Sequence, residues 1–379
     1  MKVLYAAYRH DPSDLKDTIG ADSSFFNALR QHTEYIQTTE PVKGEPVFAE
    51  RALRSFYRRF SPNHYAKYPI SYAWRASQNV NELVRTWKPD VVFTLYPPAL
   101  AFYRGTAPCI LRTDTPFFGM YQQGKKFLRH DLFGLSICVW QEKRAFSRSQ
   151  RIITHSEWAK CVLVESYRLD KKKVDVFPNP ASLAYVHRNQ VVNLLIDSNR
   201  PVELLFVGSD VPRKGVEPAI EITRQLNNRG YPANLTICGF EGKNQSHVRY
   251  VGRFDKNDLW QYAQYIKCFQ SSHFLLHPTL FDPSPRVTAE AAAFGVPTIT
   301  NDVGGMAASV KHGESGIVLP AHSPPERYVE TVISFLQQPD RYLDLRRKTR
   351  ARYERELNWE VVGKQIAEIC TSVATETLH

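Results

Sequence analysis

Residues 204–215 read LLFVGSDVPRKG, an apolar strand that runs into a glycine turn with two adjacent cations. In an open α/β sheet, ligands bind beyond the carboxyl ends of the strands, where the next helix presents free N–H groups. Arg213 and Lys214 add full positive charges at that place, so the segment suits a diphosphate. Taken alone, the segment fits a solvated pair of surface cations equally well. The chain lacks the G-x-G-x-x-G and G-x-x-x-x-G-K-[ST] patterns, which argues against a dehydrogenase and a P-loop enzyme.

Short apolar, β-branched runs alternate with longer helical patterns on both sides of this stretch. The alternation predicts parallel sheets with crossover helices. The expected strands are residues 3–8, 91–95, 109–113, 151–155 and 174–177, followed by 202–207, 235–238, 247–251, 274–277, 298–300 and 316–319. The alternation of strand and helix patterns is interrupted once and then resumes, which predicts two similar α/β domains in tandem.

The domain boundary is expected in the polar stretch 187–200, which follows Pro178-Asn179-Pro180. We place it near residue 190. This gives an N-terminal domain over 1–190, a C-terminal domain over 191–357 and a C-terminal helix over 358–379. A chain of 379 residues, at roughly 150 per domain, agrees with two domains.

The composition excludes several classes of protein. Hydrophobic residues make up 43% of the chain and charged residues 23%, which excludes a disordered or fibrous protein. No segment approaches the ~20 apolar residues that span a bilayer, and the apolar start ends at Arg9, too early for a signal peptide. The six cysteines are scattered, with no C-x-x-C pair and no His at metal-ligand spacing. We expect a cytoplasmic protein with reduced thiols and no metal.

The net charge of +11 lies in one half of the chain. Residues 1–190 carry 28 Lys and Arg against 17 Asp and Glu, whereas residues 191–379 carry 21 of each kind. Residues 51–81 contain six basic side chains and no acid. A field of this kind concentrates anionic partners such as phosphates, anionic lipid headgroups or nucleic acid.

Residues 47–60 place apolar side chains at helical spacing. The arginines of this segment lie largely on the other side, and they are Arg51, Arg54, Arg58 and Arg59. One interpretation is an ordinary surface helix packed on the sheet. The other is an interfacial helix whose arginines meet lipid phosphate or an anionic acceptor.

A second informative stretch, residues 281–297, reads FDPSPRVTAEAAAFGVP. Asp282 stands in a proline-rich loop, and Glu290 stands eight residues later in the following helix. Carboxylates accept hydrogen bonds from vicinal hydroxyls, so Asp282 suits sugar hydroxyls and Glu290 suits a ribose diol. The backbone N–H groups near Thr288 are placed to meet phosphate. The alternative makes Asp282 a turn former and Glu290 an ordinary carboxylate on a helix face.

The ordered set of these segments resembles the retaining glycosyltransferases of the GT-B class, family 4 (glycosyltransferase group 1). The resemblance covers most of residues 202–320. It rests on a G-x-x-x-x-[RK]-K-G turn at 208–215, the acid-x7-Glu pair, an A-x-G-x-P segment ending at Pro297, a D-V-G-G turn at 302–305 and a final G-E-x-G-x-x-x-P at 313–320. In the first half it is limited to residues 154–160 and 176–179.

The resemblance implies an α/β fold with two facing Rossmann-like domains and a C-terminal helix that crosses back to the first domain. It also implies retaining, metal-independent hexosyl transfer with a nucleotide sugar as substrate and no cofactor. Lys214 with Arg213 would hold the donor diphosphate, and the acid pair would hold sugar and ribose. The implied catalytic positions are Asp114, Arg213, Lys214 and Asp282. The implied donor-binding positions are Gly20, Ser209, Arg213, Lys214, Asp282, Ser284, Pro285, Arg286, Val287, Thr288 and Glu290.

The sequence departs from the family pattern in three places. Ser209 replaces the usual Arg after the first glycine of the phosphate turn, so Arg213 must supply the second cation. The first acid is Asp282, where family members usually have Glu. The segment before the linker ends in Asn179-Pro180 instead of Asn-Gly. These departures leave the diphosphate site in place and the identity of the donor open.

The N-terminal half offers weaker candidates. The family places a glycine-rich loop after the first strand, and Gly20 is the best match here. Family members often have a His near the reacting sugar after the strand at 109–113, where this chain has Asp114. We take Asp114 as the candidate there, with a turn cap before Pro116 as the equal alternative.

The expected function is transfer of a sugar from a UDP- or GDP-sugar to a glycan, lipid-linked or other anionic acceptor. The enzyme would be cytoplasmic, and peripheral on the inner face of the membrane if its basic half meets lipid. One alternative is a GT-B nucleotide-sugar epimerase or phosphorylase. Another is a non-catalytic protein that binds anionic surfaces or nucleic acid. Nucleic acid is not expected as a partner, because the sequence has no recognisable DNA or RNA motif.

Overall fold

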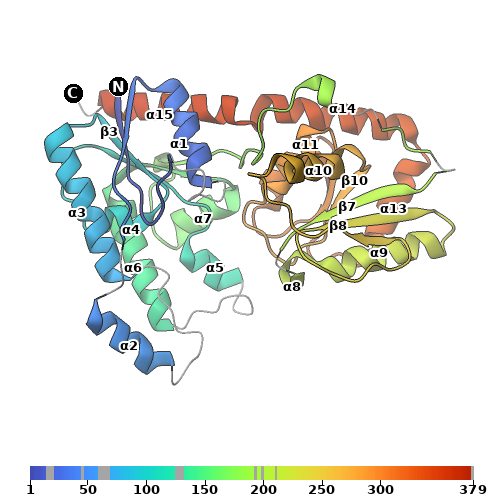
Figure 1. Cartoon of the computed structure of the whole chain (residues 1–379), viewed down its shortest axis with the longest axis horizontal. Coiled ribbons are helices and arrows are strands. Elements are labelled where there is room, and N and C mark those ends of the chain that lie inside the picture. Colours follow the sequence, from blue (N-terminus) through green and yellow to red (C-terminus); the bar gives the residue numbers. More distant parts are fainter. Residues whose placement is uncertain are drawn as a thin grey trace. The chain divides into compact units, whose positions relative to one another are not determined.

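The computed structural model of the chain describes residues 1–13, 21–43, 47–58, 69–123, 132–191, 194–197, 200–209 and 211–376. The chain divides into two compact units (Figure 1). Unit 1 comprises Met1–Phe177 and Trp359–His379, and unit 2 comprises Pro178–Asn358. The first division thus falls after residue 177, whereas the sequence analysis places it near residue 190. The reason is packing, because Ala181, Leu183 and Val186 are buried in the core of unit 2.

Unit 1 is built on a six-stranded parallel sheet. Its strands are β1 (Lys2–Tyr5), β2 (Tyr35–Thr38), β3 (Val91–Thr94), β4 (Cys109–Arg112), β5 (Ser149–Thr154) and β6 (Val174–Val176). They lie in the order β2-β1-β3-β4-β5-β6, and β1 pairs with both β2 and β3. The strand order reverses between β1 and β3, which makes their carboxyl ends the topological switch point of this sheet.

Helices cover both faces of the unit 1 sheet. The helices of unit 1 are α1 (Ala21–His32), α2 (Phe48–Arg58), α3 (Ile70–Trp87), α4 (Pro97–Leu100), α5 (Phe117–Gln123), α6 (Leu132–Arg148), α7 (Glu157–Glu165) and α15 (Trp359–Glu376), and no described residue of α2 belongs to the core around the sheet. Val3 and Tyr5 pack with residues of α1 and α15, while Leu4 points to the opposite face with α3, α4 and α6. Figure 1 shows α15 alongside α1. The C-terminal helix therefore belongs to the first unit, which confirms that part of the expected fold.

Unit 2 is also built on a six-stranded parallel sheet. Its strands are β7 (Val202–Val207), β8 (Ala233–Cys238), β9 (Val248–Tyr250), β10 (Phe274–His277), β11 (Thr298–Asn301) and β12 (Gly316–Leu319). Their order is β12-β11-β10-β7-β8-β9, which is the strand order of the doubly wound dinucleotide-binding fold. The order reverses between β7 and β10.

The helices of unit 2 complete a second Rossmann-like unit. They are α8 (Val211–Lys214), α9 (Val216–Asn228), α10 (Leu259–Gln270), α11 (Val287–Ala293), α12 (Met306–Ser309), α13 (Pro325–Leu336) and α14 (Pro339–Glu356). Leu204 and Phe206 pack with α9 and α13 on one face, and Leu205 packs with α10 and α11 on the other. The expected pair of Rossmann-like domains is confirmed.

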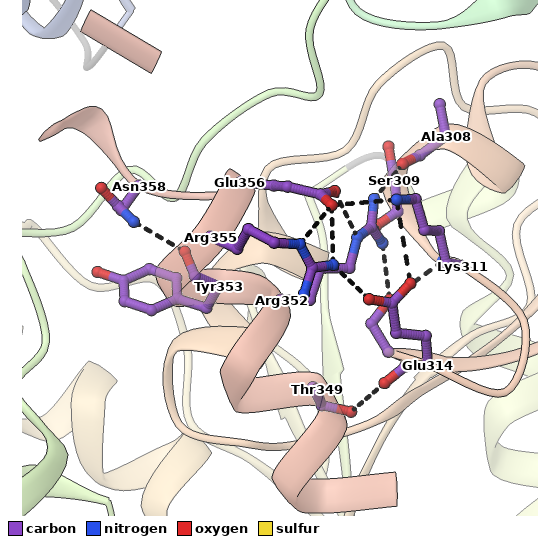
Figure 2. A network of polar contacts seen from close by, with 11 residues as sticks. Ala308, Ser309, Lys311, Glu314, Thr349, Arg352, Tyr353, Arg355, Glu356 and Asn358 are labelled. Atoms are coloured by element: carbon purple, nitrogen blue, oxygen red, sulfur yellow. Dashed lines mark hydrogen bonds and ion pairs between the residues drawn. The ribbon is translucent and has the colours of Figure 1, made fainter. Parts of the chain in front are cut away.

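Helix α14 is anchored by charged side chains as well as by apolar ones. Arg352 is buried, and its guanidinium donates to two backbone carbonyls and a hydroxyl, those of Ala308, Ser309 and Ser315, at 2.6 to 2.9 Å (Figure 2). Ion pairs among Lys311, Glu314, Arg355 and Glu356 surround it. This network ties α14 to the segment between β11 and β12, which carries the glycine turns of the sequence motif.

The eleven expected strands are all present. The largest change is in β1, which ends at Tyr5 instead of residue 8. Strand β2 is not predicted from the sequence. It is an edge strand whose residues are all at least partly exposed, so they form no apolar run. Among the described residues, no helix combines the length and apolar character that crossing a membrane requires.

Candidate functional site

The reversal of strand order in unit 2 brings the carboxyl ends of β7 and β10 side by side. This is the usual position of a ligand in an open α/β sheet. The turn 208–215 leaves β7, and the loop 278–286 leaves β10. The two most informative stretches of the sequence therefore meet at one edge of the unit 2 sheet.

Close backbone contacts shape the turn after β7. Gly215 has a φ of +81°, and a Cβ atom there would lie 2.1 Å from the carbonyl oxygen of Pro278. The carbonyl of Arg213 accepts a hydrogen bond from the backbone N–H of Leu280 at 2.9 Å. These contacts fasten the short helix α8, with Arg213 and Lys214, to the loop after β10.

Asp282 lies between the polar side chains that meet at this edge of the sheet. Its Oδ2 forms an ion pair with Lys214 and lies 3.7 Å from a guanidinium nitrogen of Arg213 and 3.2 Å from Nε2 of His277. The Asp282 side chain is 5% exposed, against 14% for Lys214 and 21% for Arg213. The carboxylate is enclosed, and the two cations reach solvent.

The electrostatics keep this carboxylate ionised. Burial by itself would raise the pKa of Asp282, but the hydrogen bond from His277 and the charge of Lys214 outweigh burial and hold the pKa below its usual value. Burial lowers the pKa of His277, so its imidazole is neutral at pH 7 and donates its Nε2–H to Asp282. Within the described part of the chain, the buried Nδ1 of His277 has no hydrogen-bond partner.

Glu290 lies in α11 and is held by a second lysine. Its Oε1 accepts a hydrogen bond from Lys256 Nζ at 2.7 Å, and its Oε2 accepts one from the hydroxyl of Tyr265. Burial and the neighbouring carboxylate raise the pKa of Tyr265, so that hydroxyl keeps its proton. The Glu290 side chain is 4% exposed and that of Lys256 is 37% exposed. Each acid of the pair therefore has a lysine partner.

The loop between the two acids is held by the segment that follows Pro178. Nδ2 of Asn179 donates to Oγ of Ser284 at 2.8 Å and to its carbonyl at 3.1 Å. Arg286 donates to Oγ of Ser182 at 2.7 Å. Ser284 and Arg286 thus have positioning contacts in this structure that the sequence analysis did not foresee.

The remaining predicted donor positions lie around the same edge. Val287 begins α11, whose first-turn N–H groups lack intrahelical partners. The hydroxyl of Thr288 donates to the carbonyl of Pro285 at 2.9 Å. Ser209 is exposed at the start of the turn after β7. The structure brings these positions to one edge with Arg213, Lys214, Asp282 and Glu290.

The D-V-G-G turn supports the backbone of Asp282. The N–H of Gly305 donates to the carbonyl of Asp282 at 2.9 Å. Gly304 has a φ of +58°, and a Cβ atom there would lie 2.6 Å from the same carbonyl. The glycines of this motif therefore permit the close approach that fixes the acid loop.

In unit 1, Asp114 follows β4 and its side chain is 43% exposed. Arg112 donates to Asp114 through one terminal nitrogen and to Nε2 of His155 through Nε, at 2.6 Å. Nδ1 of His155 lies 2.7 Å from the carbonyl of Phe177, so Nδ1 carries the proton and Nε2 accepts. His155 orients Arg112, and Arg112 orients Asp114.

A buried acid lies at the switch point of unit 1. Asp22, in the first turn of α1, accepts a hydrogen bond from the hydroxyl of Tyr5 at 3.1 Å and another from the hydroxyl of Tyr96. Burial raises the pKa of Asp22, because its hydrogen bonds only partly offset the loss of water. Gly20, predicted in the glycine loop just before it, lies outside the described residues.

The basic segment of unit 1 forms helix α2. Val47 is 52% exposed and Phe48 is 77% exposed, so the beginning of this helix leaves apolar side chains in solvent. Arg51 is exposed. Arg54 and Arg58 belong to the described backbone of α2, and Arg59 lies outside the described residues.

The sequence analysis misses three partners of the acid pair, His277, Tyr265 and Lys256. His277 leaves a signal, because it is a polar residue at the end of an otherwise apolar strand. Lys256 stands in a polar loop and Tyr265 in an ordinary helical pattern, so neither is distinguishable from its neighbours. In the part of the chain that the structure describes, no three His, Cys, Asp or Glu side chains gather as a metal ion would need.

Two parallel six-stranded Rossmann-like units are the architecture of the GT-B fold. Sucrose-phosphate synthase from Thermosynechococcus elongatus aligns over 99% of this chain and 100% of its own, with a TM-score of 0.69 at 15% identity. The lipopolysaccharide glycosyltransferase WaaG aligns over 98% and 100%, with a TM-score of 0.65 at 14% identity. Anabaena HepE in complex with UDP-glucose aligns over 98% and 100%, with a TM-score of 0.64 at 12% identity. At these identities the likeness concerns the fold alone.

Family matches cover both units. Residues 194–352 match the family described as "Glycosyl transferases group 1", and residues 36–185 match "Glycosyltransferase Family 4". The chain belongs to this family of GT-B glycosyltransferases.

Curated relatives match only part of the chain. Glycogen synthase of Mycobacterium tuberculosis is 28% identical over 182 residues, 45% of this chain and 42% of that protein. D-inositol 3-phosphate glycosyltransferase of Gordonia bronchialis is 24% identical over 246 residues, 58% of this chain and 51% of that protein. The chain therefore spans about half the length of these relatives.

Proposed function

We propose that this protein transfers a sugar from a nucleotide-sugar donor to an acceptor, and that unit 2 binds the donor. The proposal rests on one observation, the enclosed Asp282 carboxylate with Lys214 and Arg213 around it at the switch point of the unit 2 sheet. Two cations that reach solvent beside an ionised acid suit a ligand with a diphosphate at one end and hydroxyls at the other.

Lys214 and Arg213 hold the diphosphate. Preorganised cations stabilise the negative charge that develops on a leaving diphosphate, and the gain is largest in an enclosed site. In this structure Lys214 forms an ion pair with Asp282. When the diphosphate takes over Lys214, the Asp282 carboxylate can accept hydrogen bonds from the hydroxyls of the transferred sugar.

Glu290 holds the ribose, and the first turn of α11 contributes N–H groups to phosphate. The Glu290 carboxylate has two oxygens and several acceptor positions, so ribose hydroxyls can bind while Tyr265 keeps its hydrogen bond. Lys256 is 37% exposed and is the partner that can move away.

The reaction retains the configuration at the anomeric carbon, on one face of the sugar. The departing phosphate assists deprotonation of the acceptor, so we assign no nucleophile from the protein. Lys214 and Arg213 supply the charge that a metal ion supplies in other enzymes. Asp114 is the candidate side chain on the acceptor unit, and Arg112 fixes its direction.

The acceptor is a glycan, a lipid-linked molecule or another anionic compound. The basic excess of residues 1–190 and the exposed Val47 and Phe48 at the start of α2 favour an acceptor presented at an anionic membrane surface. Each Lys or Arg near such a surface contributes about 1 kcal/mol, so four arginines can move the protein from solution to the surface. The protein would then be cytoplasmic and peripheral on the inner face of the membrane.

Donor hydrolysis tests the activity without knowledge of the acceptor. UDP-, GDP- and ADP-sugars are incubated with the protein, and released sugar and nucleotide are measured. One donor should be hydrolysed slowly with the anomeric configuration retained, and turnover should persist in the presence of a chelator. Conversion of the donor to an epimeric nucleotide sugar, or release that depends on added inorganic phosphate, would instead favour an epimerase or a phosphorylase.

Liposome sedimentation tests the membrane surface. The protein should bind anionic vesicles and not neutral ones, and binding should weaken at high salt because the Debye length is about 8 Å already at physiological ionic strength. Replacement of Arg51, Arg54, Arg58 and Arg59 by Gln should reduce binding. Replacement of the exposed Lys348 and Arg224 of unit 2 is the control. Equal binding to neutral vesicles would assign the basic segment to a soluble acceptor.

A further inference from the structure

Unit 2 contains a pocket of about 650 Å³ that none of the donor-site residues lines. Its walls come from Arg188, Val191 and Leu195, from Gly295 after α11 and from one side of α14. Four arginines line it, and we call it the arginine pocket: Arg188, Arg346, Arg347 and Arg350. The volume lies within the usual range of small-molecule sites.

The pocket carries a net positive charge. Among its lining residues Glu354 is the one acid, which leaves a formal charge of +3. Glu354 accepts hydrogen bonds from Arg188 at 2.7 and 2.5 Å and from Nε of Arg350 at 3.0 Å. The hydrogen bond from Arg188 lowers the pKa of Glu354, so this acid is ionised and already shared between two guanidinium groups.

The four arginines occupy two levels. Arg346 is 6% exposed and Arg350 is 8% exposed, so they form the floor of the pocket. The Arg188 side chain is 82% exposed and Arg347 is also exposed, so these two form the rim. A ligand that enters therefore meets two exposed cations first and two buried cations beneath them.

A structural role explains the two floor arginines and, through its ion pair with Glu354, Arg188, but it does not explain Arg347. Arg346 and Arg350 donate to the carbonyls of Phe294 and Ala293 at the C-terminal end of α11, where cations are favourable. Arg350 uses three of its five N–H groups in hydrogen bonds to Glu354, Ala293 and Val186. Arg347 makes no ion pair with any described residue, and no such role accounts for its place beside Arg188 at the mouth of the same cavity.

We propose that the arginine pocket is a second anion-binding site, which takes a soluble small molecule that carries a phosphate or diphosphate ester. Guanidinium groups match phosphate oxygens in bidentate geometry, which makes arginine the preferred side chain for such ligands. The pocket has room beyond the phosphate, and Leu195 and Leu343 offer apolar surface to the organic part of the ester. The recessed floor favours a soluble ligand over a lipid headgroup.

The pocket and the donor site share helix α11. Glu290 stands three residues before Ala293, whose carbonyl Arg350 holds, and a helix of this length spans about 10 Å. The two sites are close but have no residue in common. The inference does not depend on the proposed transferase activity, and a titration can count the two sites separately.

Calorimetric titration with inorganic pyrophosphate tests the proposal on four proteins. They are the native chain, Lys214→Ala, the rim variant Arg188→Gln/Arg347→Gln and the triple variant. We expect two binding sites on the native chain, one on each of the first two variants and none on the triple variant. The rim variant should weaken the pocket site at least tenfold, and its melting temperature should stay near the native value because both side chains are exposed.

A charge-matched control is Arg224→Gln/Lys348→Gln, which removes two exposed cations of unit 2 that pair with Glu221 and Asp344 outside the pocket. It should bind two pyrophosphates. If the rim variant also binds two pyrophosphates, or if the control loses the same site, the arginine pocket is not a site for a soluble phosphate ester. In the first case, loss of binding to phosphatidic acid vesicles by the rim variant would identify a lipid headgroup as the ligand instead. If Lys214→Ala keeps two sites, the diphosphate role of Lys214 fails while the pocket stands.

Discussion

The two acids of the proposed donor site differ in how enclosed their lysine partners are. Asp282 lies in a loop after β10 and is enclosed with Lys214, whose side chain is 14% exposed. Glu290 lies within α11, and the side chain of its partner Lys256 is 37% exposed. Both carboxylates are nearly inaccessible, at 5% and 4% exposure, so the difference lies in the cations.

The difference in exposure indicates that the Asp282 ion pair is enclosed and that the Glu290 ion pair is accessible to water. An ion pair that water reaches contributes little, with a median near 0 to 1 kcal/mol, and exchanges readily for a ligand. Breaking an enclosed pair leaves a buried charge without its partner and costs about 3 to 5 kcal/mol. We therefore expect removal of the Lys214 charge to lower both stability and turnover. Removal of the Lys256 charge should have a smaller effect on each.

The largest expected effect is that of Lys214→Ala. A charge-assisted contact is worth about 1.5 to 3 kcal/mol, so kcat/KM for the donor should fall about ten- to a hundredfold, and further if the contact strengthens in the transition state. The melting temperature should fall as well, because Asp282 stays buried and loses its ammonium partner. Steady-state kinetics and thermal unfolding measure the two effects.

The double variant Lys214→Ala/Asp282→Asn separates these effects. It removes the buried charge together with its partner, so stability should return toward the native value while turnover stays low. An unchanged kcat/KM in folded Lys214→Ala would remove the basis for the diphosphate site. Failure of the double variant to regain stability would mean that the ion pair is not enclosed in solution.

The next largest effect distinguishes Asp282 from Glu290, because each carboxylate is proposed to contact a different part of the donor. Asp282→Asn should leave the affinity for free UDP or GDP nearly unchanged and impair sugar transfer, because Asp282 meets the sugar. Glu290→Gln should weaken binding of the same nucleotides about tenfold, because an amide replaces the carboxylate at the ribose. Calorimetry with the nucleotide and kinetics with the full donor give the two values. Equal losses of nucleotide affinity in both variants would disprove the division of roles.

A smaller effect is the dependence of stability on pH. The folded-state pKa of Asp282 lies below its unfolded value of about 3.9, so its contribution is present above pH 4 and is lost as the pH falls. Each unit of this depression is worth roughly 1.4 kcal/mol. The difference in unfolding free energy between the native protein and Asp282→Asn should therefore be largest near pH 6 and shrink toward pH 3. Urea titrations across this range measure it, and a constant difference would contradict the prediction.

The fold is predictable from the sequence because each buried strand has its own apolar run. β7, β10 and β12 have the predicted bounds, and the family motifs fall where the chain leaves β7 and β10. Strand β2 is not predictable in this way, because an edge strand with exposed residues has no such run. The boundary after residue 177 is set by packing of the following segment on unit 2, which no local composition reveals.

The charged residues of the proposed site are predictable from the sequence, but their hydrogen-bond and ion-pair partners are not. The sequence predicts Lys214, Asp282 and Glu290 as site residues from their types and spacing, and the structure brings the three to one edge of the unit 2 sheet. The sequence does not reveal that Lys256 pairs with Glu290, because that contact joins a polar loop to a helix 34 residues later. It does not reveal the hydrogen bond between His277 and Asp282 either: these residues are 5 apart, but their contact depends on how the loop after β10 folds back on the end of the strand.

The smallest and most discriminating effect is that of Lys256→Gln. Ribose hydroxyls must displace the Lys256 ammonium from Glu290, so removal of the charge should tighten binding of free UDP or GDP by up to about fivefold, as expected for a partly exposed pair worth up to 1 kcal/mol. Tyr265 still holds the other carboxylate oxygen, so the acid keeps its direction. Lys267→Gln, on α10, is the control for loss of one charge. Calorimetry of both variants decides the sign: tighter binding marks Lys256 as an exchangeable partner, whereas weaker binding would make it a ligand contact and would place it beside Lys214 in function despite its exposure.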